Sequence, residues 1–403
     1  MMKTLRKKMS FFDYYLFIPY LLLSIIGTVM VYSASSISQL YLGGGFDSYL
    51  LKQLLFTVLG VIVFFIVSYL NQRIWANIMV VEFGYVVLIG LLIYALVFGT
   101  AVNGAKGWIN LGAFSIQPAE LCKVYIAIYV AWFCGMRQKI VNQDIIPTKI
   151  NFLTRPYILA LMMIIMLGLI LKAPDTGGFL INFMILFMIL LAASNSLKII
   201  LGGLVGLLIA YSILLIILAK TKLGTLMPGY AYGRILSFFD PFKYATETGK
   251  QVVNSYYAIS NGGLLGQGIG NSIQKRGYLP EAHTDFILAI ISEELGAIGV
   301  TVVLVLLCWI IMRIFLIGIR SKTIFNALFC YGIGTFFLIE TLLNVGAVCG
   351  LVPVTGVTLP FISYGGSSML VLSAALGMVV NISIKQKRKL EFDVLEKKRK
   401  KSS

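Results

Sequence analysis

Long apolar runs separated by short polar stretches fill the chain from one end to the other. Each run is about 20 residues long, the length that a helix needs to cross a bilayer. Because lipid offers no partner to backbone polar groups, we expect every run to be helical. The ten predicted spans are residues 14–34, 51–70, 78–98, 117–136, 156–171, 178–194, 199–219, 285–318, 324–349 and 367–384. The eighth run is longer than a bilayer requires, so we expect it to tilt or to begin outside the membrane.

Composition agrees with a membrane protein that has no sizeable soluble domain. Of the 403 residues, 59% are hydrophobic and only 12% are charged, and the mean hydropathy is +0.92. A soluble domain carries about twice that share of charge. The alternating strand pattern of a membrane barrel is absent. The sequence therefore predicts an all-α integral membrane protein of about ten transmembrane helices, with residues 1–403 forming one polytopic domain.

Basic residues indicate which side of the membrane each loop faces. The net charge is +17, and much of it lies in two tails, residues 1–13 and 385–403. Such clusters bind the anionic cytoplasmic leaflet, so we expect no nucleic-acid partner. The short loops on the same side hold Arg73, Arg137, Lys139, Lys149, Arg155, Arg320 and Lys322, and those on the other side hold little beyond Lys106 and Lys172. By the positive-inside rule, both termini are cytoplasmic.

One long loop, about residues 220–284, is extracytoplasmic in this topology. Its stretches FFDPF, SYYAISNGG and GLLGQGIGNS are not of low complexity. A loop of that length in a compact protein is usually functional or disordered. We expect amphipathic segments here that lie on the outer membrane face.

The end of this loop, YLPEAHTDFILAIISEEL at residues 278–295, gathers polar groups where an apolar helix starts. Asp285 is either a helix cap or a general base whose pKa rises in a partly desolvated cleft. His283, the chain's single histidine, either tunes this carboxylate or caps the loop. Glu293 and Glu294 lie two turns deeper, where we expect packing roles.

Further charged groups lie within or beside the spans, where charge is costly and points to function. Glu120 and Lys123 are three residues apart and share a helix face. They form either a buried ion pair or a phosphate-binding cation that Glu120 positions. Asp175, in APDTGG, either caps the sixth span or belongs to a site, and Glu340 lies inside the ninth span.

Residues 350–368, GLVPVTGVTLPFISYGGSS, join the last two spans with a backbone broken by proline and glycine. Irregular backbone at membrane depth survives where it lines a cavity or is buried in protein. The hydroxyls of this stretch therefore either bind sugars or phosphates or cap the last span; they are Thr355, Ser363, Ser367 and Ser368. No Walker loop is present, so ATP is not expected, and one histidine with five scattered cysteines predicts no zinc site.

Four blocks, YLPEAHTDFILAIISEELG, QPAELCK, APDTGG and NVGAVCGLVPVTGVTLPFISYGGSS, resemble those of the SEDS family (shape, elongation, division and sporulation). Their order and the ten-span frame match over nearly the whole chain, and the loop blocks look most like the division branch. The chain departs from the family pattern at Gly107, Ala119, Ala173 and Thr176. These departures affect the substrate contacts expected of Asp175 and Trp108.

The resemblance implies a peptidoglycan glycosyltransferase that polymerises lipid II outside the cytoplasmic membrane, at the division septum. It also implies a class B penicillin-binding protein and other division proteins as partners. The family's essential aspartate falls on Asp285, which would act as the base of an inverting transfer. The candidate cations for the pyrophosphate are Lys123, Arg234, Lys275 and Arg276, or a divalent ion (Mg²⁺ or Mn²⁺) held partly by Asp285 or Glu281.

Two other functions remain open from the sequence. A lipid II flippase would need a polar path through the bilayer, which the mid-membrane charges could line. A scaffold that only recruits a transpeptidase would need no catalytic carboxylate. Dependence on Asp285 separates a polymerase from both.

Overall fold

The computed structural model describes residues 11–42, 48–75, 77–102, 105–112, 114–142, 156–194, 196–221 and 229–402. The first ten residues of the basic N-terminal tail, together with Lys149 and Arg155 in the predicted cytoplasmic loops, lie outside these ranges.

Ten long helices account for the ten predicted spans. They are α2 (Tyr14–Leu42), α3 (Ser48–Tyr69), α5 (Ile78–Phe98), α6 (Pro118–Asn142), α7 (Pro156–Lys172), α8 (Thr176–Ala193), α9 (Leu197–Lys220), α12 (Ile287–Ile319), α13 (Ile324–Val348) and α14 (Gly366–Ser402). In the described part of the chain, nine of them are long and apolar enough to cross a membrane. The tenth, α7, is apolar and 17 residues long. The prediction of an all-helical membrane fold is confirmed.

Shorter elements lie in the loops. They are α4 (Gln72–Trp75), α10 (Gly229–Phe239), α11 (Lys250–Gly262) and the strands β1 (Thr100–Val102), β2 (Ala105–Asn110) and β3 (Ser115–Ile116). The strands form a small antiparallel sheet in the order β1-β2-β3, which the sequence analysis did not predict. The expected helical segments of the long loop are α10 and α11.

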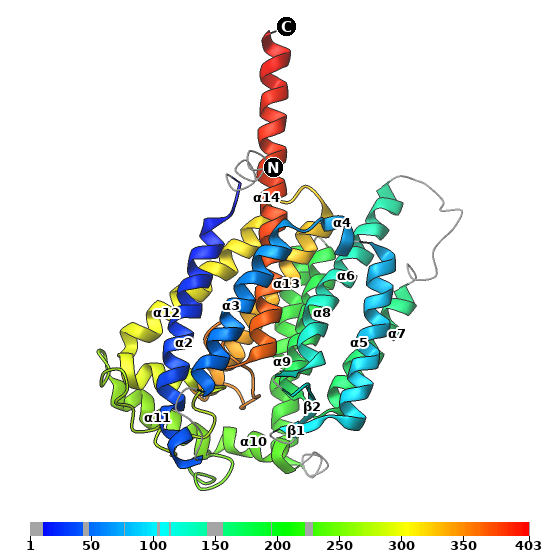
Figure 1. The fold of residues 1–403 in the computed structure, drawn as a ribbon. Helices are drawn as coiled ribbons and strands as arrows, with labels where there is room; N and C mark the ends of the chain where they lie inside the picture. Colours follow the sequence, from blue (N-terminus) through cyan, green and yellow to red (C-terminus); the bar gives the residue numbers. More distant parts are fainter. Residues whose placement is uncertain are drawn as a thin grey trace.

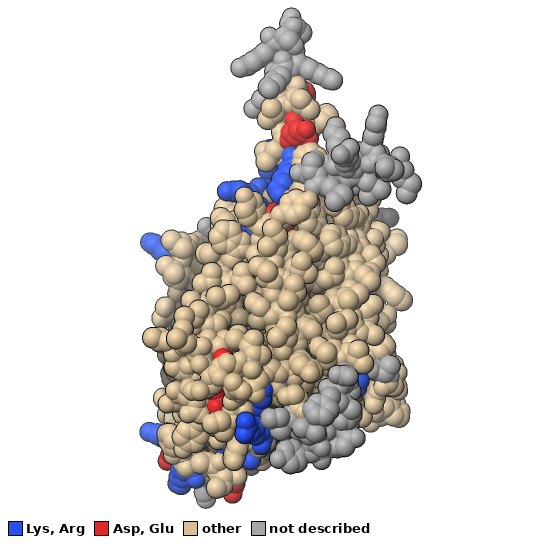
Figure 2. All heavy atoms as spheres, turned by 60° about the vertical axis from the view of Figure 1, so that its left-hand side comes forward, with Lys and Arg blue, Asp and Glu red and all other residues tan. Residues whose placement is uncertain are grey.

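The two ends of the bundle differ in what they carry. The start of α2 and the end of α14 lie at one end, whereas α10, α11 and the strands lie at the other (Figure 1). The basic loops belong to the first end, which places both termini on the cytoplasmic side. Charged side chains gather at the two ends, and the wide band between them is almost uncharged on the face shown in Figure 2. Such a band matches the hydrocarbon layer of a bilayer.

The core of the bundle surrounds α13, which packs against α12, α8 and α6, while α14 packs against α3. By contrast, α9 contacts only its neighbours α8 and α10 extensively and exposes apolar side chains such as Leu201, Leu208 and Ile213. A helix that is apolar all round and exposed fits lipid rather than water as its surroundings.

The backbone of α12 is interrupted at Gly296, where φ is 68° and ψ is −171°. The eighth span was expected to be over-long because it tilts or begins outside the membrane. A short helical segment of about two turns precedes the interruption and a long one follows it. The expected tilt or start outside the membrane stays a prediction. A positive φ of this kind is readily available to glycine, which has no Cβ.

A segment of the outer loop, residues 263–268, satisfies the backbone groups that the interruption leaves open. The amides of Gln267 and Gly268 donate to the carbonyl oxygens of Glu293 and Glu294 at 2.9 and 3.0 Å. In return, the amides of residues 297 and 298 donate to the carbonyl oxygens of residues 263 and 264 at 3.0 and 3.3 Å. The loop therefore forms backbone hydrogen bonds with α12 at the interruption, in addition to packing against the helix.

This contact requires glycine in the loop. A Cβ added at Gly262, the last residue of α11, would overlap the carbonyl oxygen of Ser292. A Cβ at Gly266, where φ is 80°, would overlap the carbonyl oxygen of Glu294. In both cases the obstacle is backbone, which cannot rotate away.

We expect Gly262→Ala to destabilise the folded protein by about 3 kcal/mol or more, because the methyl group would push the loop out of the α12 interruption. Thermal unfolding of the purified protein in detergent would measure the loss. Gly206→Ala in α9 is the matched control: its Cβ meets nothing within 4 Å, and alanine favours the helix. Equal melting temperatures for both variants would contradict the proposed fit.

Candidate active site

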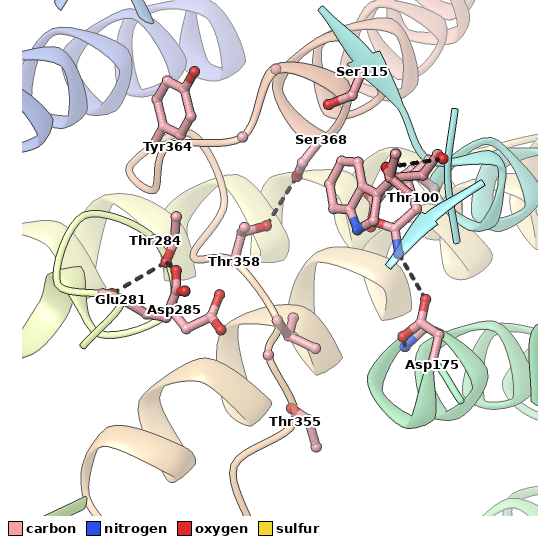
Figure 3. A pocket seen from close by; sticks show the side chains of 18 of the residues that line it. Thr100, Ser115, Asp175, Glu281, Thr284, Asp285, Thr355, Thr358, Tyr364 and Ser368 are labelled. Atoms are coloured by element: carbon pink, nitrogen blue, oxygen red, sulfur yellow. Dashed lines mark hydrogen bonds between the residues drawn. The ribbon is translucent and has the colours of Figure 1, made fainter. Parts of the chain in front are cut away.

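A cavity of about 550 Å³ opens at the outer end of the bundle. Its walls come from α3, the strands, the starts of α6 and α8, α10, the turn before α12 and residues 355–368. Most of the predicted site residues line it: Trp108, Glu120, Lys123, Asp175, Arg234, Glu281 and Asp285. Figure 3 shows Asp285 and Asp175 on opposite sides, with Thr358 and Ser368 between them.

Asp285 faces this cavity from the turn that precedes α12. The N-cap residue of α12 is Phe286, so Asp285 does not occupy the cap position that the sequence left open as an alternative. Burial and the nearby Glu281 carboxylate raise the pKa of Asp285, Arg234 opposes them, and the result is a pKa of about 7. A carboxylate with such a pKa can accept a proton near neutral pH.

Glu281 is held beside Asp285 by a tight turn. Its own φ is 55°, and its carbonyl oxygen accepts hydrogen bonds from the amides of Thr284 and Phe286 at 3.2 Å. The Thr284 hydroxyl donates to Glu281 Oε2 at 2.6 Å, as the dashed line in Figure 3 marks. This turn keeps two carboxylates together, which is the arrangement that raises a carboxyl pKa.

Arg234 of α10 reaches the same point from the opposite direction. A Cβ built on Gly356 would lie 3.5 Å from both Arg234 Nη2 and Asp285 Oδ2. Gly356 also has a φ of 75°, so this position favours glycine for conformational reasons as well. The guanidinium and the carboxylate therefore share one corner of the cavity.

Lys123 forms the inner wall of the cavity together with Glu120. Its ammonium lies 2.6 Å from Glu120 Oε1 and 3.8 Å from Glu340 Oε1, and its side chain is 1% exposed. Thr358 donates to Glu340 Oε1 at 3.1 Å. The buried ion pair that the sequence offered as one alternative is present, and the same two residues line the cavity. Phosphate binding by Lys123, the other alternative, stays a prediction.

Asp175 combines two structural contacts with its place in the cavity wall. Its carboxylate caps α8 by accepting from the Gly178 amide at 2.7 Å, and it accepts from Gln117 Nε2 at 2.8 Å. Burial raises the pKa of Asp175, while the Gly178 amide and Lys123 oppose the rise. The cap interpretation is correct, and the same carboxylate is also exposed to whatever the cavity binds.

The structure places five other predicted site residues, Arg276 among them, outside the cavity lining. Lys275 was expected to bind pyrophosphate, but it is buried and pairs with Glu294 Oε1 at 2.7 Å. His283 lies against Tyr49 and Tyr364, with ring centroids 4.8 and 5.7 Å away. Burial lowers the pKa of His283, an effect that Glu281 opposes, so the ring is neutral at pH 7 and packs the loop.

Ser363 and Ser367 lie outside the cavity lining and form hydrogen bonds with the segments around it. Ser363 Oγ donates to the Thr284 carbonyl oxygen at 2.7 Å and accepts from the Leu359 amide at 2.8 Å. Ser367 Oγ donates to the carbonyl oxygen of Ser115 in β3 at 2.8 Å. Both hydroxyls therefore join the last loop to neighbouring walls, in place of the substrate contacts expected of them.

Several cavity residues were not predicted from the sequence, among them Lys52 and Gln117. Lys52 of α3 lines the cavity, and a lysine inside an apolar run is a signal that could have found it. Gln117 also lines it and supports Asp175, and its place at the start of the QPAELCK block is a signal that could have found it.

Comparison with known proteins identifies the family. The sequence model of the family described as "Cell cycle protein" (FtsW/RodA/SpoVE) matches residues 13–388. The chain belongs to this family. The SEDS resemblance inferred from the sequence blocks is confirmed.

Similar members of the family extend over nearly the same length. The "Probable peptidoglycan glycosyltransferase FtsW" of Bacillus subtilis is 37% identical over 386 residues, covering 94% of this chain and 92% of the relative. The protein of the same name from Enterococcus hirae is 37% identical over 380 residues, covering 93% and 92%. The resemblance to the division branch of the family agrees with these names.

Solved structures share the fold. A chain from a structure described as "Structural coordination of polymerization and crosslinking by a peptidoglycan synthase complex" aligns with a TM-score of 0.70 and 25% identity, covering 93% of this chain and 98% of that one. The rod shape determining protein RodA of Thermus thermophilus aligns with a TM-score of 0.62 and 24% identity, covering 92% and 96%. The latter similarity concerns the fold alone.

The two candidate metal ligands, Asp285 and Glu281, both face the cavity. Among the described residues, no group of three or more His, Cys, Asp or Glu side chains is placed to hold a metal ion. The protein thus offers at most two carboxylates here. This fits Mg²⁺, which commonly takes one or two carboxylates and completes its shell with water and phosphate oxygens.

We expect Asp175→Ala to destabilise the protein by about 1 kcal/mol, because α8 loses its cap and Gln117 loses its acceptor. Asp175→Asn keeps an acceptor oxygen at the same place and should lose less than half as much. Thermal unfolding of both variants is the measurement. If asparagine proved as destabilising as alanine, the charge of Asp175 rather than its hydrogen bonds would be what stabilises α8.

Proposed function

We propose that this protein is a peptidoglycan glycosyltransferase that polymerises lipid II at the outer face of the cytoplasmic membrane. The observation that carries the proposal is Asp285, a carboxylate with a pKa near 7 in a cavity at the outer end of a membrane bundle. The names of its FtsW relatives support the same activity. The cavity's place at the outer end suits a substrate whose lipid tail stays in the bilayer.

The reaction joins the 4-hydroxyl of one disaccharide to the anomeric carbon of another. Asp285 takes the hydroxyl proton, the oxygen forms the new bond from the opposite face of the sugar, and the bond to undecaprenyl pyrophosphate breaks. Pyrophosphate leaves without a general acid, because its oxygens are already weakly basic. Lys52, Lys123 and Arg234 approach from three elements and supply positive charge for it.

We also propose that a divalent cation binds at this site together with the substrate. Asp285 and Glu281 would hold it, and pyrophosphate oxygens would complete its shell. Bound there, it would supply charge stabilisation to the leaving group.

We infer a class B penicillin-binding protein as the partner that cross-links the product, at the division septum and together with other division proteins. The aligned chain from a peptidoglycan synthase complex supports a partner of this kind, since that complex couples polymerisation to crosslinking. The similarity to proteins named FtsW supports the septal role.

The mid-membrane charges do not favour a flippase. Glu293 and Glu294 hydrogen-bond to the outer loop, and Lys123 is paired with Glu120 and Glu340. A polar path needs groups that face an open route through the bilayer, whereas Glu293, Glu294 and Glu340 are fully buried and do not line the cavity. A scaffold, in turn, would have no use for a carboxylate kept partly protonated at neutral pH.

Asp285→Asn should lower polymerisation at least about 100-fold, because asparagine keeps the size of the side chain and removes the base. The protein would be purified with a candidate class B partner and supplied with labelled lipid II, and product would be resolved by gel electrophoresis. Asp240→Asn, an exposed outer-loop aspartate that does not line the cavity, is the control and should be fully active. Equal product from the Asp285 variant and the wild type would refute the catalytic role.

The rate of polymerisation should rise with pH and reach half its maximum near pH 7. The base must be ionised to accept a proton, and burial holds the pKa of Asp285 at about 7. Initial rates between about pH 5.5 and pH 8.5 test this, with the Asp240→Asn variant following the same curve. A rate that is flat across the range would mean that Asp285 titrates near its ordinary value of 3.8 instead.

A further inference from the structure

Two adjacent carboxylates on α12, Glu293 and Glu294, are fully buried and lie outside the cavity. Glu293 accepts hydrogen bonds from four groups of the outer loop. These are the Ser272 hydroxyl, the amides of Ile273 and Gln274 at 3.2 Å, and Asn261 Nδ2 at 3.2 Å. One carboxylate therefore holds both the end of α11, through Asn261, and residues 272–274 of the loop.

Glu294 holds the next residue of that segment and a third element. It pairs with Lys275 Nζ at 2.7 Å and accepts from the Ser33 hydroxyl of α2 at 2.7 and 2.8 Å. Lys275 Nζ also lies 3.0 Å from Ser33 Oγ. The side chains of the pair are 1% and 0% exposed, so the contact is shielded from water.

Burial of such a pair is costly, and apolar residues of similar volume often stabilise a fold as well or better. A buried charge cluster is therefore better explained by the position that it enforces than by its stabilising effect. Here the position is that of residues 272–275, each of which is in contact with one of the two carboxylates or with Ser272.

The fixed segment leads directly to the catalytic turn. Ten positions separate Lys275 from Asp285 in the sequence. The Leu279 amide donates to the Gln274 carbonyl oxygen at 2.9 Å, and Leu279 and Ala282 are buried. Asn254 of α11 holds the Tyr278 carbonyl oxygen at 2.7 Å. No other helix or strand intervenes between the segment and the turn.

We propose that Glu293, Glu294 and Lys275 form a clasp that positions the Asp285 turn, so that these three are positioning residues for glycosyl transfer. The proposal rests on the proposed function of Asp285. The clasp acts through the placement of the backbone, since its charges do not line the cavity. Those that do line it, among the described residues, are Lys52, Glu120, Lys123, Asp175, Arg234, Glu281 and Asp285 itself.

The test replaces the buried pair by neutral side chains, with Glu294→Gln combined with Lys275→Met, so that no unpaired charge is left inside. The matched control neutralises another ion pair of α12, at its cytoplasmic end, in which the carboxylate is fully buried and the guanidinium is partly exposed. There Asp13 Oδ2 lies 2.8 Å from Arg313 Nη2, and the control combines Asp13→Asn with Arg313→Met. Folded fractions are measured first, and all rates are expressed per folded molecule.

Two readouts follow for each protein. Hydrogen–deuterium exchange of residues 276–286 reports the order of the turn, and steady-state kinetics with labelled lipid II and the partner separate kcat from KM. In the clasp variant we expect exchange about tenfold faster and kcat at least about tenfold lower, with KM within about twofold, because small misplacements of a catalytic group are costly. The control should match the wild type in both.

If the double variant does not fold, Ser272→Ala replaces it in the test, because it removes one hydrogen bond of Glu293. This variant should change exchange and kcat in the same directions as the double variant, but by smaller factors. Exchange that is unchanged in a folded clasp or Ser272 variant overturns the proposal. A loss of kcat equal to that of the control also overturns it. A wild type that makes no polymer would refute the proposed function instead, and exchange would still test the clasp.

Discussion

The interruption of α12 at Gly296 is the constraint on which the outer half of the molecule depends. A helix broken at membrane depth leaves amides and carbonyls that lipid cannot satisfy. Here residues 263–268 of the outer loop satisfy them with four backbone hydrogen bonds. The loop must therefore lie against the break, and this fixes α11 and the segment after it. Three requirements then coincide at one place: glycine in the loop, glycine in the helix, and carboxylates that face the loop.

The proposed reaction requires Asp285 to be ionised, and this ionisation lowers the stability of the folded protein. Its folded pKa of about 7 lies above the unfolded value of 3.8, so the folded state binds the proton more tightly. Stability from this group is therefore complete below pH 3.8 and is lost as pH rises towards 7. At the pH where the base is ionised, the turn carries an unfavourable buried charge. A turn in that condition needs supports that do not depend on Asp285, such as the contacts of Ser363 and the clasp.

The sequence predicted those features that follow from the membrane alone. All ten spans fall on helices because apolar length is a direct requirement of the bilayer. The place of Asp285 was also predictable, since a carboxylate between a polar loop and an apolar helix has few suitable environments. Lys275 was misjudged because a cation before a catalytic loop looks the same whether it faces substrate or a buried carboxylate. Only the tertiary structure shows that its partner is the buried carboxylate of Glu294.

The remaining differences have similar causes. Strands of two, three and six residues leave little pattern in a sequence, so the small sheet was not predicted. Gly296 lies in LGAIG within an apolar run, where a glycine is usually tolerated inside the helix without interrupting it. What decides its conformation is the loop that pairs with it, whose glycines are about 30 residues away in the sequence.

Lys123 belongs both to a buried ion pair and to the cavity lining, so the proposed pyrophosphate-binding cation is already paired in the protein. Glu120 holds its ammonium at 2.6 Å, whereas Glu340 lies at 3.8 Å, beyond hydrogen-bonding distance. The two carboxylates hold the ammonium in place at the inner wall of the cavity. A pyrophosphate at the inner wall would compete first with the longer contact, the one between Lys123 and Glu340. Glu340, which Thr358 also holds, would then keep its hydroxyl donor while Lys123 turned towards the leaving group. The cluster thus provides a cation without leaving an unpaired charge at the edge of the membrane.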